Sequence, residues 1–210
     1  LLGWLYGVWR WQDDRRVRYA VTAAIAILPV QIVLGGVTTT AGGMFPRGFN
    51  PAIMTAHFTT ATTIFSLLVY ATARMVGAPS ARWVQTVVGL GGGLLSFHAI
   101  FEFVPVFPHQ PTNQVAYYAA SFALLAAFVA LLVWSESAVD PANLLRFRSV
   151  VVAGVAVLYF DMVLSRHLWG VPEVAGTATT FVLAGLVVGL SLVTSRTVTD
   201  AGGLGTQQAD

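Results

Sequence analysis

The stretch QIVLGGVTTTAGGM at residues 31–44, followed by TAHFTTATTIF at residues 55–65, decides how this sequence is interpreted. Both segments lie in or overlap apolar runs long enough to cross a membrane. They nevertheless contain a glutamine, a glycine pair and a histidine where leucine would suffice. Lipid does not require such residues, so they indicate either close packing between helices or a functional site inside the membrane.

The composition is that of an integral protein of the cell membrane. Of the 210 residues, 56% are hydrophobic and 10% are charged, whereas a soluble domain carries about a quarter charged residues. The basic residues are arginines scattered at the ends of apolar runs, which argues against nucleic acid as a partner. The absence of cysteine excludes disulfides and thiolate ligands, so any metal would bind histidine, methionine or carboxylate.

Apolar runs of membrane-spanning length follow one another along the chain. A transmembrane helix needs roughly 20 such residues, and the predicted spans are 17–39, 52–74, 83–104, 115–135, 149–168 and 174–195. The short links between them predict an all-α polytopic bundle over residues 17–196, with about six helices running up and down. Residues 1–16 are interpreted as the end of a preceding helix, truncated here, or as an interfacial segment, and residues 197–210 as a cytoplasmic tail.

The arginines predict the orientation of the bundle. With the N-terminal basic patch in the cytoplasm, nine arginines fall on the cytoplasmic side: Arg10, Arg15, Arg16, Arg18, Arg74, Arg82, Arg146, Arg148 and Arg196. Arg47 and Arg166 fall outside. The C-terminus is then cytoplasmic as well.

This orientation places all four histidines and several carboxylates near the outer surface. These residues are His57, His98, His109 and His167, with Glu102, Asp161 and Glu173. Ionisable residues inside a membrane are costly and commonly mark a functional site in the bundle interior. For Asp161 the sequence leaves two interpretations open, an ion pair with Arg166 or His167 and a role in proton relay.

Two histidines are candidate ligands. His98 and Glu102 are four residues apart on one helix face, so they either form a structural pair or Glu102 orients His98 toward a metal. His57 lies among small hydroxyl residues, which leave room for a porphyrin plane, and imidazole is the usual axial ligand of haem iron. The alternative for His57 is a structural histidine.

Residues 15–76 resemble the second hairpin of the four-helix repeat in the haem A synthase family. The resemblance rests on Gln31, the pair Gly35 and Gly36, Thr38, and His57 followed by Phe58 and Ala61. It implies an oxidoreductase that converts haem O to haem A by oxidising a porphyrin methyl to formyl. The haem would be b-type, or haem O and haem A as substrate and product.

The resemblance also implies roles for individual residues and partners. His57 would be an axial ligand, and Gln31 and Thr38 would line the mouth of the hairpin. The residues themselves, and not the resemblance, make His98 the second candidate ligand, with Glu102 and Asp161 supporting the ligands. The expected partners are membrane lipid, haem, haem O synthase, an electron donor and a second copy of the chain.

Two other functions remain open from the residues alone. One is a non-enzymatic membrane subunit or transporter, in which the outer histidines and carboxylates form an entry site for protons or metal ions. The other is a copper site built from His57, His98 and Asp161, because ligands on different helices meet only in the fold.

Overall fold

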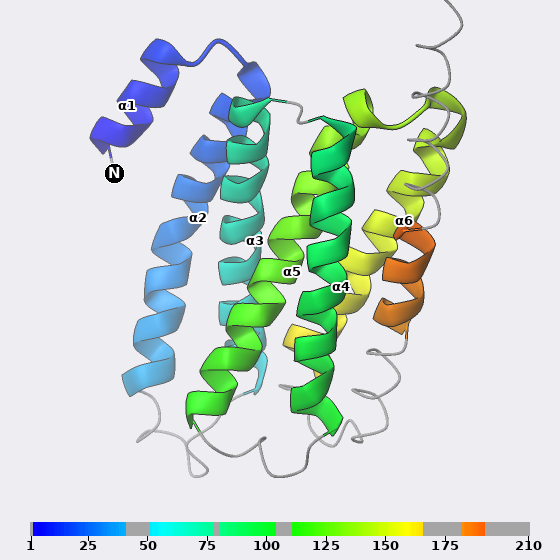
Figure 1. Cartoon of the computed structure of the whole chain (residues 1–210). Helices are drawn as coiled ribbons and strands as arrows, with labels where there is room; N and C mark the ends of the chain where they lie inside the picture. The colour runs from blue at the N-terminus through cyan, green and yellow to red at the C-terminus, as the bar shows by residue number, and fades with distance from the viewer. Residues whose placement is uncertain (1, 41–50, 78–79, 104–110, 166–181, 192–210) are drawn as a thin grey trace, which may run out of the picture.

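A computed structural model describes residues 2–40, 51–77, 80–103, 111–165 and 182–191, and every regular element in them is helical (Figure 1). The elements are α1 (Leu2–Trp11), α2 (Arg15–Thr40), α3 (Pro51–Val76), α4 (Ala81–Phe103), α5 (Pro111–Ala138), α6 (Pro141–Tyr159), the π-helix η2 (Phe160–Ser165) and a helix at Val182–Ser191. Within these residues, four segments are long and apolar enough to span a membrane: Arg15–Thr38, Ala52–Val76, Val115–Ala138 and Pro141–Met162. The predicted all-α membrane bundle is confirmed, whereas the number of six spans stays a prediction.

Helix α5 is the centre of the bundle. It packs against α3, α4 and α6, while α2 lies along α3 at one side of the bundle (Figure 1). Half of the most apolar stretch of α5 is buried, compared with 17% for α2 and 6% for α3. Lipid is as apolar as the interior of the protein, so the exposed faces of α2 and α3 need no protein partner.

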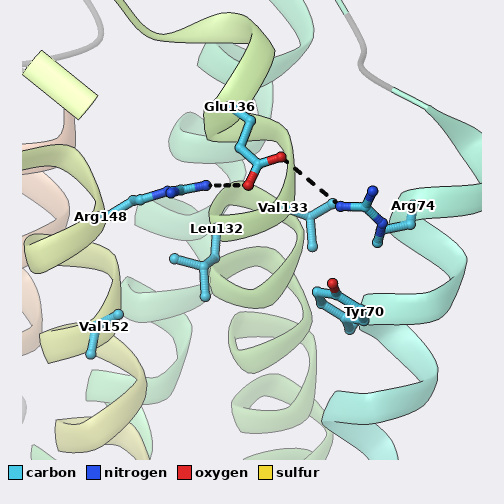
Figure 2. Close-up of a pocket in the computed structure, with 7 residues that line it drawn as sticks. All are labelled: Tyr70, Arg74, Leu132, Val133, Glu136, Arg148 and Val152. Carbon is cyan, nitrogen blue, oxygen red and sulfur yellow. Dashed lines mark hydrogen bonds and ion pairs between the residues drawn. The ribbon is translucent and has the colours of Figure 1, made fainter. Parts of the chain in front are cut away.

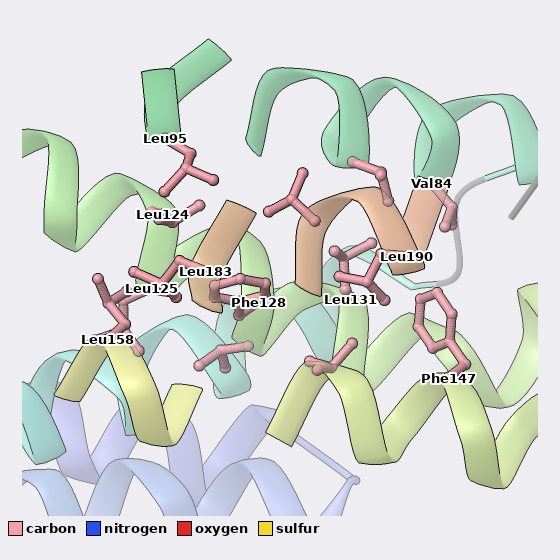
Figure 3. Close-up of a cluster of buried hydrophobic side chains, with 14 of the residues drawn as sticks. Val84, Leu95, Leu124, Leu125, Phe128, Leu131, Phe147, Leu158, Leu183 and Leu190 are labelled. Atoms are coloured by element: carbon pink, nitrogen blue, oxygen red, sulfur yellow. The ribbon is translucent and has the colours of Figure 1, made fainter. Parts of the chain in front are cut away.

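The main apolar core joins α4, α5, α6 and the helix at Val182–Ser191 (Figure 3). Phe128 of α5 and Leu183 are almost completely buried in it. Opposite Phe128 lies Gly154 of α6, where an added Cβ would be 2.8 Å from the phenyl ring. The missing side chain therefore lets α6 approach α5 closely.

Helix α6 begins at Pro141 rather than near residue 149, where the apolar run starts. The Asp140 carboxylate accepts a hydrogen bond from the backbone N–H of Ala142, and proline occupies the first turn, which together form a favourable helix start. The stretch expected to separate two spans is thus mostly helical. Arg148 lies inside α6, and its long side chain can still reach the polar surface.

The links α1–α2, α3–α4 and α5–α6 lie at the same end of the bundle, which we call the arginine end (top of Figure 1). There Arg74 Nε donates to Asp14 Oδ2 over 2.7 Å, and Arg148 Nη2 donates to Glu136 Oε1 over 2.8 Å. The clustering agrees with the charge pattern of the sequence, whereas the side of the membrane stays a prediction. Arg47, Arg166, Arg196 and the tail 197–210 lie outside the described residues.

Candidate functional site

His57 lies between α2 and α3, in the half of the bundle away from the arginine end. Across from it, Gly35 of α2 carries no side chain, and a Cβ there would be 3.2 Å from His57 Cε1. The imidazole therefore lies directly against the bare backbone of α2. Glycine at this position allows the close approach that the sequence suggested for its glycine pair.

A short chain of polar contacts orients the imidazole. The Thr60 hydroxyl donates to Gln31 Oε1, and Gln31 Nε2 lies 3.4 Å from His57 Nε2. With the NH₂ group of Gln31 facing the imidazole, His57 Nε2 accepts in the tautomer that carries its proton on Nδ1. The Thr60 hydroxyl also lies 3.0 Å from the carbonyl oxygen of Ala56 and 2.9 Å from that of His57, within its own helix.

The other nitrogen of this imidazole has no partner in the part of the chain that the structure describes. His57 Nδ1 is buried and makes no hydrogen bond there. The one contact of Nε2 is a long one, so neither nitrogen is firmly held by the protein. A neutral imidazole with its lone pair on Nε2 is the form that coordinates metal ions, including haem iron.

Thr38 lies one turn beyond Gly35 on α2. Its hydroxyl donates to the Gly35 carbonyl over 2.8 Å. This hydrogen bond is made within the helix, as is common for threonine in membrane helices. Thr38 thus lies one turn from the histidine site, and its hydroxyl is already hydrogen-bonded to a backbone carbonyl of α2.

A second polar cluster joins α3, α5, α6 and η2. The hydroxyl of Tyr117 donates to Asp161 Oδ2 over 2.5 Å, and both side chains are fully buried. Thr59 Oγ1 lies 2.6 Å from the hydroxyl of Tyr159. Asp161 sits in the π-helical turn, a feature frequent at functional sites.

The structure does not bring Asp161 to His57. His57 faces α2, whereas the next residue, Phe58, stacks on Tyr118 of α5 with ring centroids 5.1 Å apart. His57 and Asp161 thus lie against different faces of α3. Sequence reasoning missed Tyr117, although a phenol inside an apolar helix signals a need for a buried hydrogen-bond partner. Arg166 and His167, the expected partners of Asp161, lie outside the described residues.

The other predicted ligands cannot be placed in a site. His98 and Glu102 fall on α4, but their side chains lie outside the described part, as do His109 and Glu173 entirely. Among the side chains that are described, no three from histidine, cysteine, aspartate and glutamate gather as a metal site. The copper alternative finds no support in that part of the chain.

Fold and site together define a class: a helical membrane protein with a histidine held between two closely packed helices. Comparison with known proteins finds a partial match. Over 80 residues the chain is 40% identical to the "Protoheme IX farnesyltransferase" of two Halobacterium salinarum strains, which covers 36% of this chain and 17% and 16% of the two relatives. The chain thus spans about a sixth of the length of these relatives. No family model and no solved structure matches.

The expected membership of the haem A synthase family is therefore wrong. The matching curated proteins carry the name of a farnesyltransferase acting on protohaem. The predicted oxidation of haem O to haem A rested on the family membership and is therefore wrong as well. The pattern of Gln31, Gly35 and His57 that suggested this family corresponds in the structure to close packing of α2 and α3 around an imidazole. These comparisons give no support to an oxidoreductase.

Proposed function

We propose that this protein binds protohaem IX in the membrane and holds it for farnesylation. The observation that carries the proposal is the 80-residue match to proteins named for that reaction. The imidazole of His57 supplies a ligand suited to the porphyrin iron. Since the chain spans about a sixth of these relatives, the proposal concerns the haem-binding step.

The described residues around His57 fit a haem in two respects. Its buried Nδ1 lacks a hydrogen-bond partner in the described part of the chain, and Gly35 leaves the backbone of α2 bare beside the imidazole. An unpaired buried polar atom costs about 1–3 kcal/mol, so the protein holds this imidazole less firmly than it would hold a structural histidine with both nitrogens hydrogen-bonded.

The hydrogen-bond chain from Thr60 through Gln31 presets the imidazole for this task. In the tautomer with its lone pair on Nε2, this nitrogen would bind iron without first losing a proton. The contact between Gln31 Nε2 and His57 Nε2 is long, at 3.4 Å, so His57 Nε2 would be available to hold a haem and Gln31 would be available to donate a hydrogen bond to it.

Haem binding is tested by titrating protohaem IX into the purified full-length protein and following the Soret absorption. His57→Ala is expected to remove the spectrum of the ligated haem. Thr63→Val is the matched control, because the Thr63 hydroxyl is exposed and bonds only to the Thr59 carbonyl of its own helix. Equal spectra for His57→Ala and the unchanged protein would overturn the proposed ligand.

The link to farnesylation needs a separate measurement. Membranes containing the protein, a farnesyl donor and protohaem IX are analysed for farnesylated haem by mass spectrometry, with and without a protohaem IX farnesyltransferase. We expect the unchanged protein to increase the yield of farnesylated haem and His57→Ala to increase it much less. A yield that does not respond to the protein would contradict the biosynthetic role while leaving haem binding intact.

A further inference from the structure

The arginine end of the bundle contains a pocket that the proposed function does not use. It lies between α3, α5 and α6 and has a volume of about 320 Å³ (Figure 2). Arg74, Glu136 and Arg148 come into it from three different helices. A pocket that joins opposite charges from separate helices at the end of a membrane bundle is a candidate site for a charged ligand.

One carboxylate lies between two guanidinium groups in this pocket. Glu136 Oε1 accepts from Arg148 Nη2 over 2.8 Å, while Glu136 Oε2 is 4.0 Å from Arg74 Nη1. Figure 2 shows the two contacts as dashed lines on either side of Glu136. The contact to Arg74 is longer than a hydrogen bond, so Glu136 satisfies one arginine well and the other poorly.

The arginines retain donors for a further acceptor. Arg148 Nε donates to Ser135 Oγ over 3.0 Å, and Arg74 Nε donates to Asp14. An arginine has five N–H groups, and the described bonds use only part of them on each side chain. The lining of the pocket contains two guanidiniums, those of Arg74 and Arg148, and one carboxylate, that of Glu136, so the lining carries one surplus positive charge. Asp14 pairs with Arg74 from outside the lining.

The remainder of the pocket is apolar and lies deeper in the bundle. Leu132 and Val133 precede Glu136 by about one turn of α5, and Val152 follows Arg148 by one turn of α6. Because α5 ascends to the arginine end and α6 descends from it, all three residues lie on the membrane side of the charges. The pocket is therefore charged at its rim and apolar below. A phospholipid has the same order, with a charged headgroup above apolar acyl chains.

We propose that this pocket binds an anionic phospholipid, with the phosphate between Arg74 and Arg148 and an acyl chain against Val133 and Val152. Arginine forks match the geometry of phosphate oxygens. The surplus positive charge favours a headgroup of net charge −1. A zwitterionic headgroup would bring its ammonium group toward the arginines, which disfavours it.

The test is native mass spectrometry of the detergent-solubilised full-length protein titrated with phosphatidylglycerol, phosphatidylcholine or inorganic phosphate. Phosphatidylglycerol is expected to bind roughly tenfold more tightly than phosphatidylcholine, and Arg148→Gln is expected to remove that preference. Arg82→Gln is the control, since Arg82 is exposed on α4 outside the pocket. Inorganic phosphate alone is expected to bind weakly, because it gains nothing from the apolar part.

A second variant separates lipid binding from a purely structural role of the charges. Glu136→Gln removes the carboxylate that competes with the phosphate, so it is expected to bind phosphatidylglycerol several-fold more tightly. A structural salt-bridge cluster would show no such gain. The proposal is overturned if the two lipids bind equally, if Arg148→Gln retains the preference, or if inorganic phosphate displaces phosphatidylglycerol at similar concentrations.

Discussion

Gln31 of α2 faces His57 of α3, with 3.4 Å between the amide nitrogen and the ring Nε2. The Thr60 hydroxyl holds the amide oxygen of Gln31 and thereby turns its NH₂ group toward the imidazole. The arrangement suits the tautomer that has its lone pair on Nε2. It also explains why a membrane helix carries glutamine at this position, since leucine could not orient the imidazole.

The close contact between Gly35 and His57 predicts that a side chain at position 35 weakens haem binding. A Cβ at Gly35 would lie 3.2 Å from His57 Cε1, so Gly35→Ala must move the imidazole by a few tenths of an ångström. We expect haem to bind several-fold more weakly, as measured by Soret titration. Gly36→Ala is the control, because a Cβ there meets nothing within 4 Å. Equal losses in both variants would contradict the role of Gly35.

The packing of Gly154 on Phe128 predicts a loss of stability by overpacking. The added methyl of Gly154→Ala would lie 2.8 Å from the Phe128 ring in a closely packed core. We expect the free energy of unfolding to fall by about 1–3 kcal/mol, measured by denaturation in detergent. The double variant with Phe128→Leu should recover part of the loss. Gly93→Ala, whose Cβ meets nothing within 4 Å, should not destabilise the protein.

The hydrogen bond from Tyr117 to Asp161 predicts the cost of leaving a buried acceptor short of a donor. Both side chains are fully buried, and the two oxygens are 2.5 Å apart. Tyr117→Phe is expected to lower the free energy of unfolding by about 1–3 kcal/mol. Tyr19→Phe, on an exposed tyrosine, should change it by less than about 0.5 kcal/mol. Similar effects from the two substitutions would argue against a structural role for this bond.

The pairing of Asp14 with Arg74 predicts a dependence of stability on pH. The hydrogen bond from Arg74, with a second from the backbone of Arg16, lowers the pKa of the Asp14 carboxyl. A carboxyl whose folded-state pKa lies below its unfolded-state value stabilises the fold above the unfolded value. That contribution is lost as pH falls through the folded-state pKa, below about pH 4.

Thermal melts in detergent between pH 6 and pH 3 check this dependence. Asp14→Asn should melt at a lower temperature near pH 6, and the difference from the unchanged protein should shrink below about pH 4. Asp13→Asn is the matched control, because only the backbone carbonyl of Asp13 accepts a described bond, from Arg18. A difference that stays constant with pH would mean that the Asp14 carboxylate does not stabilise the fold.

The sequence predicted the parts of the fold that depend on local composition. Apolar runs long enough to span a membrane, interrupted by proline and glycine, predicted a helical bundle, which the structure confirms. The start of α6 at Pro141 was missed, because the charged residues around Arg148 resemble a loop although Asp140 and Pro141 favour a helix start. Hydropathy predicts which residues contact lipid, but it does not predict where a capped helix begins.

The candidate site was less predictable, because its contacts join residues far apart in the sequence. Gln31 and His57 were recognised as unusual residues, but their contact depends on how α2 and α3 pack. Asp161 shared the expected depth with the histidines and turned out to contact Tyr117 on another interface. The depth of a residue in the membrane follows from its position along a predicted span. Which neighbouring helix it faces depends on tertiary packing, which the sequence pattern does not give.

The most direct test of the account is the Soret titration of the purified protein with protohaem IX, comparing the unchanged chain with His57→Ala and Thr60→Val. We predict saturable binding by the unchanged protein, weaker binding by Thr60→Val and no ligated spectrum for His57→Ala. An unchanged protein that binds no haem, or a His57→Ala variant with the same affinity and spectrum, would contradict the central claim.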